Sequence, residues 1–290
     1  MDEKLKVELE KIIKNNPNYS INELNKEFKI IVDKYNSKGI VEFEGLSPEI
    51  MYNLLYSEWS KNIIVINSDS HNGGDIPIIR QIKYFVNIIK ESDGIKLTKA
   101  GYLPPIIVKK IYNEHIIPDR MIEMGVTKLT KETDVDNIVV TKIFCELAGL
   151  IKIRKNKLSL TKNAISEINS NKIFDKILFV AFKKYNWAYF DYFENEMIGG
   201  YGNNYTLFLL NKYGNDWKDS GFYADLYFKA FPELLKGFEQ ENNDICYIIR
   251  TFSLLKYFGL IEFKEKKLEI GKVRITELFR KYIKIGLYCA

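Results

Sequence analysis

The chain has 290 residues, of which 46% are hydrophobic, 28% charged and 14% aromatic, and its formal net charge is +5. This composition is typical of an ordered globular protein and excludes disordered, collagen-like and membrane-spanning chains. The three cysteines, Cys145, Cys246 and Cys289, are far apart, which excludes a disulfide framework and a paired-cysteine zinc motif. The sequence shows no signal-peptide pattern and no apolar run that could span a bilayer, so we expect a cytoplasmic protein without a membrane partner.

Charge alternates in blocks along the chain. Residues 78–112 carry a net charge of +5, residues 146–184 and 250–284 each carry +6, and residues 186–244 carry −6. Basic blocks favour contact with a polyanion such as nucleic acid, although a mixed surface of this kind also serves solubility alone.

The N-terminal part is predicted to be helical. Apolar residues recur at helical spacing over residues 5–13, and Ser20 with Glu23 forms a capping box that begins a second helix. Ser47, which a proline follows, predicts the start of a third helix. Residues 67–77 are rich in Ser, Asn, Asp and Gly, which indicates a linker.

The region after this linker shows the order of a winged helix, the helix-turn-helix variant that carries a β-hairpin. The sequence predicts a helix over residues 76–91, a strand over 94–98, and two helices over 104–112 and 134–148. Two strands, over 150–154 and 158–161, follow and are joined by a polar turn.

The last part of the chain repeats this pattern. Residues 147–158 read LAGLIKIRKNKL and residues 257–268 read YFGLIEFKEKKL, and a threonine, Thr161 or Thr276, follows each segment. Two copies of one small fold are therefore predicted. The expected fold is mainly α, with a helical N-terminal segment and two winged-helix-like units that carry short β-hairpin wings. The expected organisation is an N-terminal helical segment (residues 1–66), a linker (67–77) and a first winged-helix-like domain (78–170). An aromatic-rich helical region with the second winged-helix-like unit (171–290) follows.

Several short motifs are spread over nearly the whole chain, among them Gly45-Leu46-Ser47-Pro48, Leu97-Thr98-Lys99-Ala100-Gly101-Tyr102, Lys229-Ala230-Phe231-Pro232 and Arg250-Thr251-Phe252. They resemble a family of uncharacterised bacterial proteins with winged-helix-like segments and no assigned activity. Some relatives look fused to plasmid-encoded modules or to zinc-binding tails of the SEC-C type. The cysteine cluster of such a tail is missing from this sequence, so the resemblance implies no zinc.

No residue set for catalysis or metal binding emerges. His71 falls in the predicted linker, and His115 lies just past a predicted helix end, where a capping role is expected. Residues 198–204 contain three glycines but lack the Lys-Ser/Thr pair of a phosphate-binding loop, so a loop with positive φ is expected. Enzymatic activity is therefore the least favoured class, and no metal or cofactor is expected.

Aromatic residues concentrate in residues 185–231, which hold 16 of them, with carboxylates interleaved. Such a segment could form an open basin for sugars or bases. A buried core or a protein interface is favoured instead, because aromatic residues at helical spacing usually pack and acidic groups repel nucleic acid. We therefore expect Trp187 and Trp217 to be buried.

The two wings and the helices before them are the candidate nucleic-acid interface. Asn137 and Thr141, in the helix before the first wing, are assigned to packing. The candidate nucleic-acid contacts are basic: Lys152, Arg154, Lys155, Lys157, Arg250, Lys264, Lys266, Lys267, Lys272 and Arg274. Basic wings beside largely apolar helices favour backbone contact over base reading, and a single face shared by both wings would strengthen this interpretation.

The sequence therefore predicts a non-catalytic nucleic-acid-associated protein of low sequence specificity, in a regulatory or mobile-element context. The alternative is a protein-interaction module that uses the aromatic acidic region and the N-terminal helices.

Overall fold

The computed structural model describes residues 3–57, 63–67, 73–191, 193–235, 240–267 and 270–286. This part of the chain is mainly helical and contains three small antiparallel sheets, so the expected mainly α class is confirmed. No helix among the described residues is long and apolar enough to cross a membrane.

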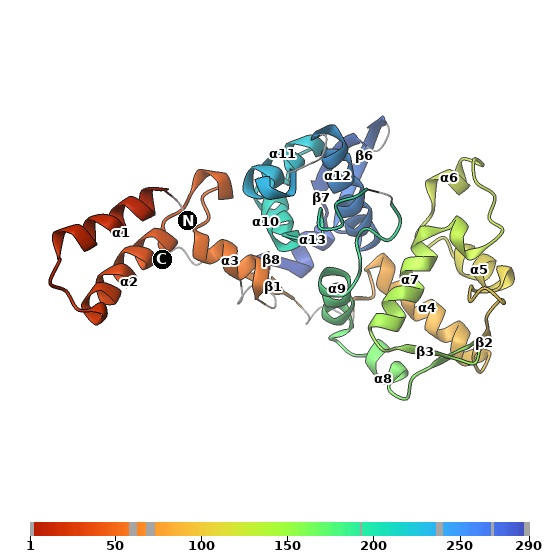
Figure 1. Ribbon diagram of the computed structural model, residues 1–290. Helices are drawn as coiled ribbons and strands as arrows, with labels where there is room; N and C mark the ends of the chain where they lie inside the picture. Colours follow the sequence, from red (N-terminus) through yellow and green to blue (C-terminus); the bar gives the residue numbers. More distant parts are fainter. Residues whose placement is uncertain are drawn as a thin grey trace.

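Three helices form the N-terminal part: α1 (Glu3–Asn15), α2 (Ile21–Ser37) and α3 (Pro48–Tyr56). The predicted capping box is confirmed, because the Ser20 hydroxyl accepts a hydrogen bond from the Glu23 amide and the Glu23 carboxylate accepts one from the Ser20 amide. Ser47 caps α3 by accepting a bond from the Ile50 amide at 3.3 Å. Helices α1 and α2 form a hairpin that projects from one end of the molecule, here called the helical arm (Figure 1).

Unit A, residues 77–160, follows the arm and α3. It contains α4 (Pro77–Glu91), β2 (Ile95–Lys96), α5 (Pro105–Tyr112), α6 (Arg120–Glu123), α7 (Asp136–Leu147), β3 (Ile151–Arg154) and β4 (Lys157–Leu160). The predicted hairpin is confirmed, and β4 lies in the middle of the sheet order β2-β4-β3. Lys155 and Asn156 form the turn with φ values of 47° and 60°, and the side-chain amide of Asn156 donates to the carbonyl groups of Leu97 and Thr98.

Unit B, residues 203–275, has the same order of principal elements. It contains α10 (Asn203–Tyr213), β5 (Lys218–Asp219), α11 (Ser220–Ala230), α12 (Gln240–Tyr257), β6 (Ile261–Lys267) and β7 (Ile270–Ile275). The sheet order β5-β7-β6 again places the last strand in the middle. Strand β5 has only two residues and was not predicted.

The sequence repeat corresponds to a repeated set of hydrogen bonds. Gly149 and Gly259 end α7 and α12 with φ values of 70° and 65°, a conformation that glycine adopts without strain. The Thr161 hydroxyl donates to the Gly149 carbonyl at 2.7 Å, and the Thr276 hydroxyl donates to the Gly259 carbonyl at 2.6 Å. Both threonines therefore close the hairpins as predicted.

One continuous core joins the two units. Helix α8 (Ala164–Ile168) and helix α9 (Ile173–Lys183) follow unit A, and α9 packs against α4 and α7. The ring of Phe174, in α9, lies 6.2 Å from that of Phe258, just past α12, and 4.7 Å from that of Tyr282, in α13 (Glu277–Tyr282). The core therefore extends from one unit to the other through α9.

A third sheet joins segments that are distant in sequence. Strand β1 (Ile64–Ile66) pairs antiparallel with β8 (Ile283–Ile285). Part of the predicted linker, including His71, lies outside the described residues, whereas Gly73 and Ile76 within it are buried. The N-terminal part is thus connected to the other end of the chain by backbone pairing.

Candidate nucleic-acid interface

Three basic side chains of unit A lie side by side on the solvent face of its sheet. The register places Lys96 of β2 opposite Lys157 of β4, and Lys157 opposite Arg154 of β3. Side chains directly opposite one another in a ladder point to the same face, and all three residues are exposed. Lys96, Arg154 and Lys157 are called the basic row below.

The positive charge of the basic row is weakly compensated within the protein. Lys157 has one acidic neighbour, Asp93, at 3.4 Å, and both side chains are exposed. Lys96, Lys152, Arg154 and Lys155 make no ion pair within the described part of the chain. Like charges placed directly opposite one another in a sheet are destabilising, so an anion bound at this face would relieve the repulsion.

The equivalent row of unit B contains an acid. Asp219 of β5 lies opposite Lys272 of β7, which lies opposite Lys264 of β6, so Asp219 occupies the position that Lys96 has in unit A. In the neighbouring row Arg274 pairs with Glu262 at 2.8 Å. The unit B hairpin is therefore closer to neutral at its described positions.

Two of the basic residues of unit B that were predicted to contact nucleic acid also pack against an aromatic ring. The ammonium group of Lys264 lies 4.3 Å from the centre of the Trp217 ring, and the Arg274 guanidinium lies 4.7 Å from it. Both distances suit cation–π contacts. The side chains of Lys266 and Lys267, which were also predicted contacts, lie outside the described residues.

The prediction for Arg250 is wrong. Its side chain is 1% exposed, and its guanidinium donates two hydrogen bonds of 2.6 Å to the Asp191 carboxylate. Further bonds to the carbonyl groups of Asn195, Ile198 and Phe193 satisfy the remaining donors. A buried and fully bonded guanidinium cannot reach a phosphate, and its partner lies 59 residues away in the sequence, so no local pattern indicated this pairing.

The helices before the wings are packed inside the protein. In α7, Asn137 and Thr141 are buried, and the Gln81 side chain donates to them at 2.9 Å and 2.8 Å, which confirms their assignment to packing. In α12, Thr251 is buried beside Arg250. Among their described side chains, neither helix offers the row of free polar groups that reads base edges in a major groove.

The two hairpins lie apart in space. Figure 1 shows the hairpin of unit A at the right-hand end of the molecule and the β6–β7 hairpin of unit B at its top. They do not form one continuous basic face, so a shared face does not support nucleic-acid binding by both hairpins. Each hairpin is therefore considered by itself.

Most of the aromatic side chains of residues 185–231 lie in the hydrophobic core or pack against it. Trp187 is 7% exposed, and Tyr223 and Tyr227 are fully buried, as predicted. Trp217 is only half-buried, because it lies at the surface between Lys264 and Arg274, so the prediction of its burial is wrong in part.

The other predicted loop features give no catalytic arrangement. Gly199 and Gly202 have φ values of 84° and 70°, as expected for the glycine-rich loop. His115 is exposed and its Nδ1 atom lies 3.6 Å from the Glu123 carboxylate. Within the described ranges, no group of three or more His, Cys, Asp or Glu residues could hold a metal ion.

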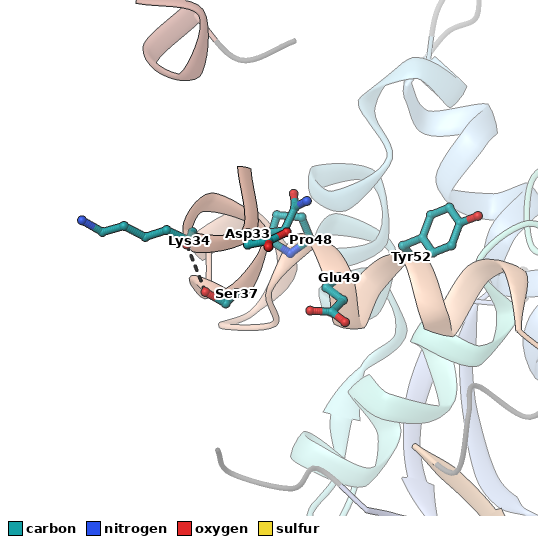
Figure 2. A pocket seen from close by; sticks show the side chains of 7 residues that line it. Asp33, Lys34, Ser37, Pro48, Glu49 and Tyr52 are labelled. Atoms are coloured by element: carbon teal, nitrogen blue, oxygen red, sulfur yellow. Dashed lines mark hydrogen bonds between the residues drawn. The ribbon is translucent and has the colours of Figure 1, made fainter. Parts of the chain in front are cut away.

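A hollow of about 930 Å³ lies between the end of α2 and the start of α3. Figure 2 shows that its side chains diverge, with Lys34 and Tyr52 pointing to opposite sides. The Ser37 hydroxyl donates to the Lys34 carbonyl and is used within α2. Because few polar groups converge, this hollow is not a candidate ligand site.

Comparison of the chain with protein-family models, with curated proteins and with solved structures gives no match in any of the three. The resemblance to a family of uncharacterised bacterial proteins therefore stays a prediction, and the candidate site depends on the geometry described above.

Proposed function

We propose that the protein is a non-catalytic nucleic-acid-associated protein in which unit A binds the phosphate backbone through its basic row. In this proposal units A and B are both winged helices. Their order of helix, strand, helix, helix and hairpin, and the central place of the last strand in both sheets, support that interpretation.

The observation that carries the proposal is the register of the unit A sheet. It aligns Lys96, Lys157 and Arg154 across three strands, with Lys152 two residues before Arg154 on the same face. A phosphate backbone presents a line of negative charges, and each phosphate that a cation neutralises releases condensed counterions. The basic row therefore has the charge and the exposure that backbone contact requires.

Low sequence specificity follows from the helices. Asn137 and Thr141 of α7 are occupied by Gln81, and Arg250 of α12 is bound to Asp191. Contacts to phosphates position a protein on nucleic acid but carry no sequence information directly.

Fluorescence anisotropy with two unrelated DNA duplexes over a salt series tests the proposal. We expect similar affinities for both duplexes and a steep loss with salt, with a log–log slope of about −0.9 for each neutralised phosphate. Replacing Lys96, Arg154 and Lys157 together by Ala should reduce the magnitude of that slope by about three and weaken binding to both duplexes equally.

The matched control is the triple Ala variant of Lys264, Lys272 and Arg274 in unit B. There Arg274 pairs with Glu262, Lys272 lies opposite Asp219, and Lys264 lies over the Trp217 ring. This control variant should change the slope by less than the unit A variant does. Absence of binding at low salt, or equal effects of the two triple variants, would overturn the assignment to the basic row.

A second candidate function, protein interaction, is favoured by the helical arm. None of residues 5–37 is buried, and five large apolar residues of the arm are exposed: Val7, Ile13, Tyr19, Ile21 and Ile30. The arm carries seven lysines and six acids over residues 3–37, so a second copy of the arm is not repelled. Two helical hairpins related by a two-fold axis can form a four-helix bundle, so the proposed partner is a second copy of the chain. The aromatic region contributes no such surface because it is mainly buried.

Light scattering coupled to size-exclusion chromatography tests this second candidate. The wild type should be dimeric, and the double variant Ile21→Asp, Ile30→Asp should be monomeric. Val41 is equally exposed but lies outside the arm, so Val41→Asp should remain dimeric. A monomeric wild type would remove the proposal.

A further inference from the structure

A small cavity lies where the two units meet. It has a volume of about 270 Å³ and lies between the start of α7, the segment that follows α9, and α12. Four aromatic residues line it: Tyr185, Trp187, Phe190 and Tyr257. Phe190 is 40% exposed, so the cavity has an aromatic rim in contact with solvent.

The charge that faces this cavity is negative. Among the described residues that line it, Arg250 is the one cation, and its guanidinium is neutralised by the bidentate contact with Asp191. The carboxylate of Asp136, the first residue of α7, also lines the cavity and makes no ion pair in the described part of the chain. One carboxylate is therefore left without a cation.

The titration of neighbouring groups agrees with this charge. Burial raises the pKa of Tyr185 and of Tyr257, and the nearby carboxylate of Asp136 raises both further. Asp136 is an exposed residue, but partial desolvation of its carboxylate, followed by repulsion from Asp119, also raises the pKa of Asp136 itself. A bound cation would relieve these unfavourable interactions.

We propose that this cavity binds a methylated or quaternary ammonium group, held among the four aromatic rings with Asp136 as its counter-ion. Aromatic faces attract a cation within about 6 Å of the ring centre, and Trp is the strongest of them. An unmethylated ammonium carries three donors that need acceptors, whereas a quaternary ammonium needs none. The volume lies below the roughly 300 Å³ of pockets for drug-sized ligands, so the ligand is a small molecule or a single side chain.

Titration followed by two-dimensional ¹H–¹⁵N NMR tests the proposal on the wild-type chain. The indole N–H of Trp187 donates to the Ala181 carbonyl at 2.8 Å, so it is a fixed reporter within the site, and Trp187→Phe identifies its signal. Choline should shift this signal in a saturable manner. The neutral isostere 3,3-dimethylbutan-1-ol should not. Equal shifts with both compounds, or no shift up to about 50 mM choline, would overturn the proposal.

Two variants separate the counter-ion from general effects of charge. Asp136→Asn should weaken choline binding by about tenfold or more, because the ammonium group loses its carboxylate partner. Asp225→Asn removes an exposed carboxylate that does not line the cavity and should leave binding unchanged. The wild-type comparison of choline with its isostere does not depend on the folding of either variant.

Peptides distinguish the two sources of such a group. A short peptide with trimethyllysine, compared with choline, shows whether the ligand is a protein side chain or a free small molecule, and binding of either supports the proposal. Equal binding of the same peptide with unmodified lysine would contradict it, and so would a Trp187 shift caused by mononucleotides in place of choline.

Discussion

Units A and B share a topology and differ in surface charge. Both have the same order of principal elements, the same sheet order and the same threonine–glycine hydrogen bond behind the hairpin. Unit A contains 15 basic and 9 acidic residues, whereas unit B contains 11 basic and 10 acidic residues. In both sheets the same three positions lie side by side across the strands. The residue on the first strand, Lys96 in unit A or Asp219 in unit B, decides whether the three charges repel one another or partly cancel.

The interiors of the two units differ as well. In unit A, the neutral side chain of Gln81 bridges Asn137 and Thr141. In unit B, the charged side chain of Arg250 is buried against Asp191. Charge is thus exposed and only weakly compensated at the sheet of unit A, but buried and paired at the last helix of unit B.

The largest effect is expected from breaking the buried pair of unit B. Asp191→Ala leaves the Arg250 guanidinium buried without a counter-ion, which should lower the free energy of unfolding by about 3–5 kcal/mol. Gln81→Met in unit A removes a neutral donor and should cost about 1–3 kcal/mol. Urea unfolding of both variants measures the difference, and equal losses would show that the two interiors are equivalent.

Exchanging the residues that distinguish the two rows should transfer the difference in binding. Lys96→Asp gives unit A the residue type found in unit B, and duplex DNA affinity should fall by about tenfold at low salt, corresponding to about 1.4 kcal/mol. Asp219→Lys makes the opposite change in unit B and should strengthen binding. Anisotropy titrations of the two variants provide the measurement. If both variants bound DNA with the same affinity, the charge at these two positions would not determine binding.

The paired threonines should differ in their effect on stability. Thr161→Val loses the bond to the Gly149 carbonyl and should cost about 1 kcal/mol. Thr276→Val also loses the cap of α13, because the Thr276 hydroxyl accepts a bond from the Phe279 amide at 3.2 Å, and should cost about 2 kcal/mol. Thermal and urea unfolding would show the order, and a larger loss in unit A would contradict the assignment of the cap.

The smallest effect concerns pH and has opposite signs at two carboxylates, Glu44, which contacts unit B, and Asp136 of unit A. Burial raises the pKa of Glu44, but hydrogen bonds from Tyr213 and Lys212 of unit B outweigh it, so the pKa is lowered. Its contribution to stability is present above about pH 4.3 and is lost as the pH falls through the lowered folded-state pKa. Partial desolvation and repulsion from Asp119 raise the pKa of Asp136 in unit A, so ionisation of Asp136 weakens the fold as the pH rises.

Melting temperatures at pH 6 and pH 3 measure the opposite contributions of Glu44 and Asp136 to stability. Glu44→Gln should lower the melting temperature at pH 6, and this loss should shrink as the pH falls toward 3 and the carboxyl group becomes protonated. Asp136→Asn should leave the melting temperature unchanged or raise it at pH 6. A loss at pH 6 for Asp136→Asn would show that the carboxylate is already compensated in the free protein.

Local signals in the sequence predicted much of the fold. Ser20 and Ser47 were predicted as helix caps, and both hairpins were predicted from alternation and turn residues, because each of these features depends on residues that are close in sequence. Strand β5 has two residues and no alternation of its own, so only its pairing with β7 defines it.

The candidate site was less predictable for the same reason. The wing lysines were found from their density, but the importance of Lys96 depends on a register that joins strands about 60 residues apart. The error at Arg250 has the same origin, because a basic residue in a helix near an apolar hairpin has the same local pattern whether it faces solvent or a distant aspartate.

The pairing of β1 with β8 has a consequence for synthesis of the chain. The partner of Ile66 is Ile283, so β8 leaves the ribosome roughly 220 residues after β1. At about 5–20 residues per second, the backbone of β1 waits for about 10–45 s without its sheet partner. An unpaired strand edge is a site of aggregation during that interval, so chaperone demand during translation should be greatest for the segment that contains Ile64–Ile66.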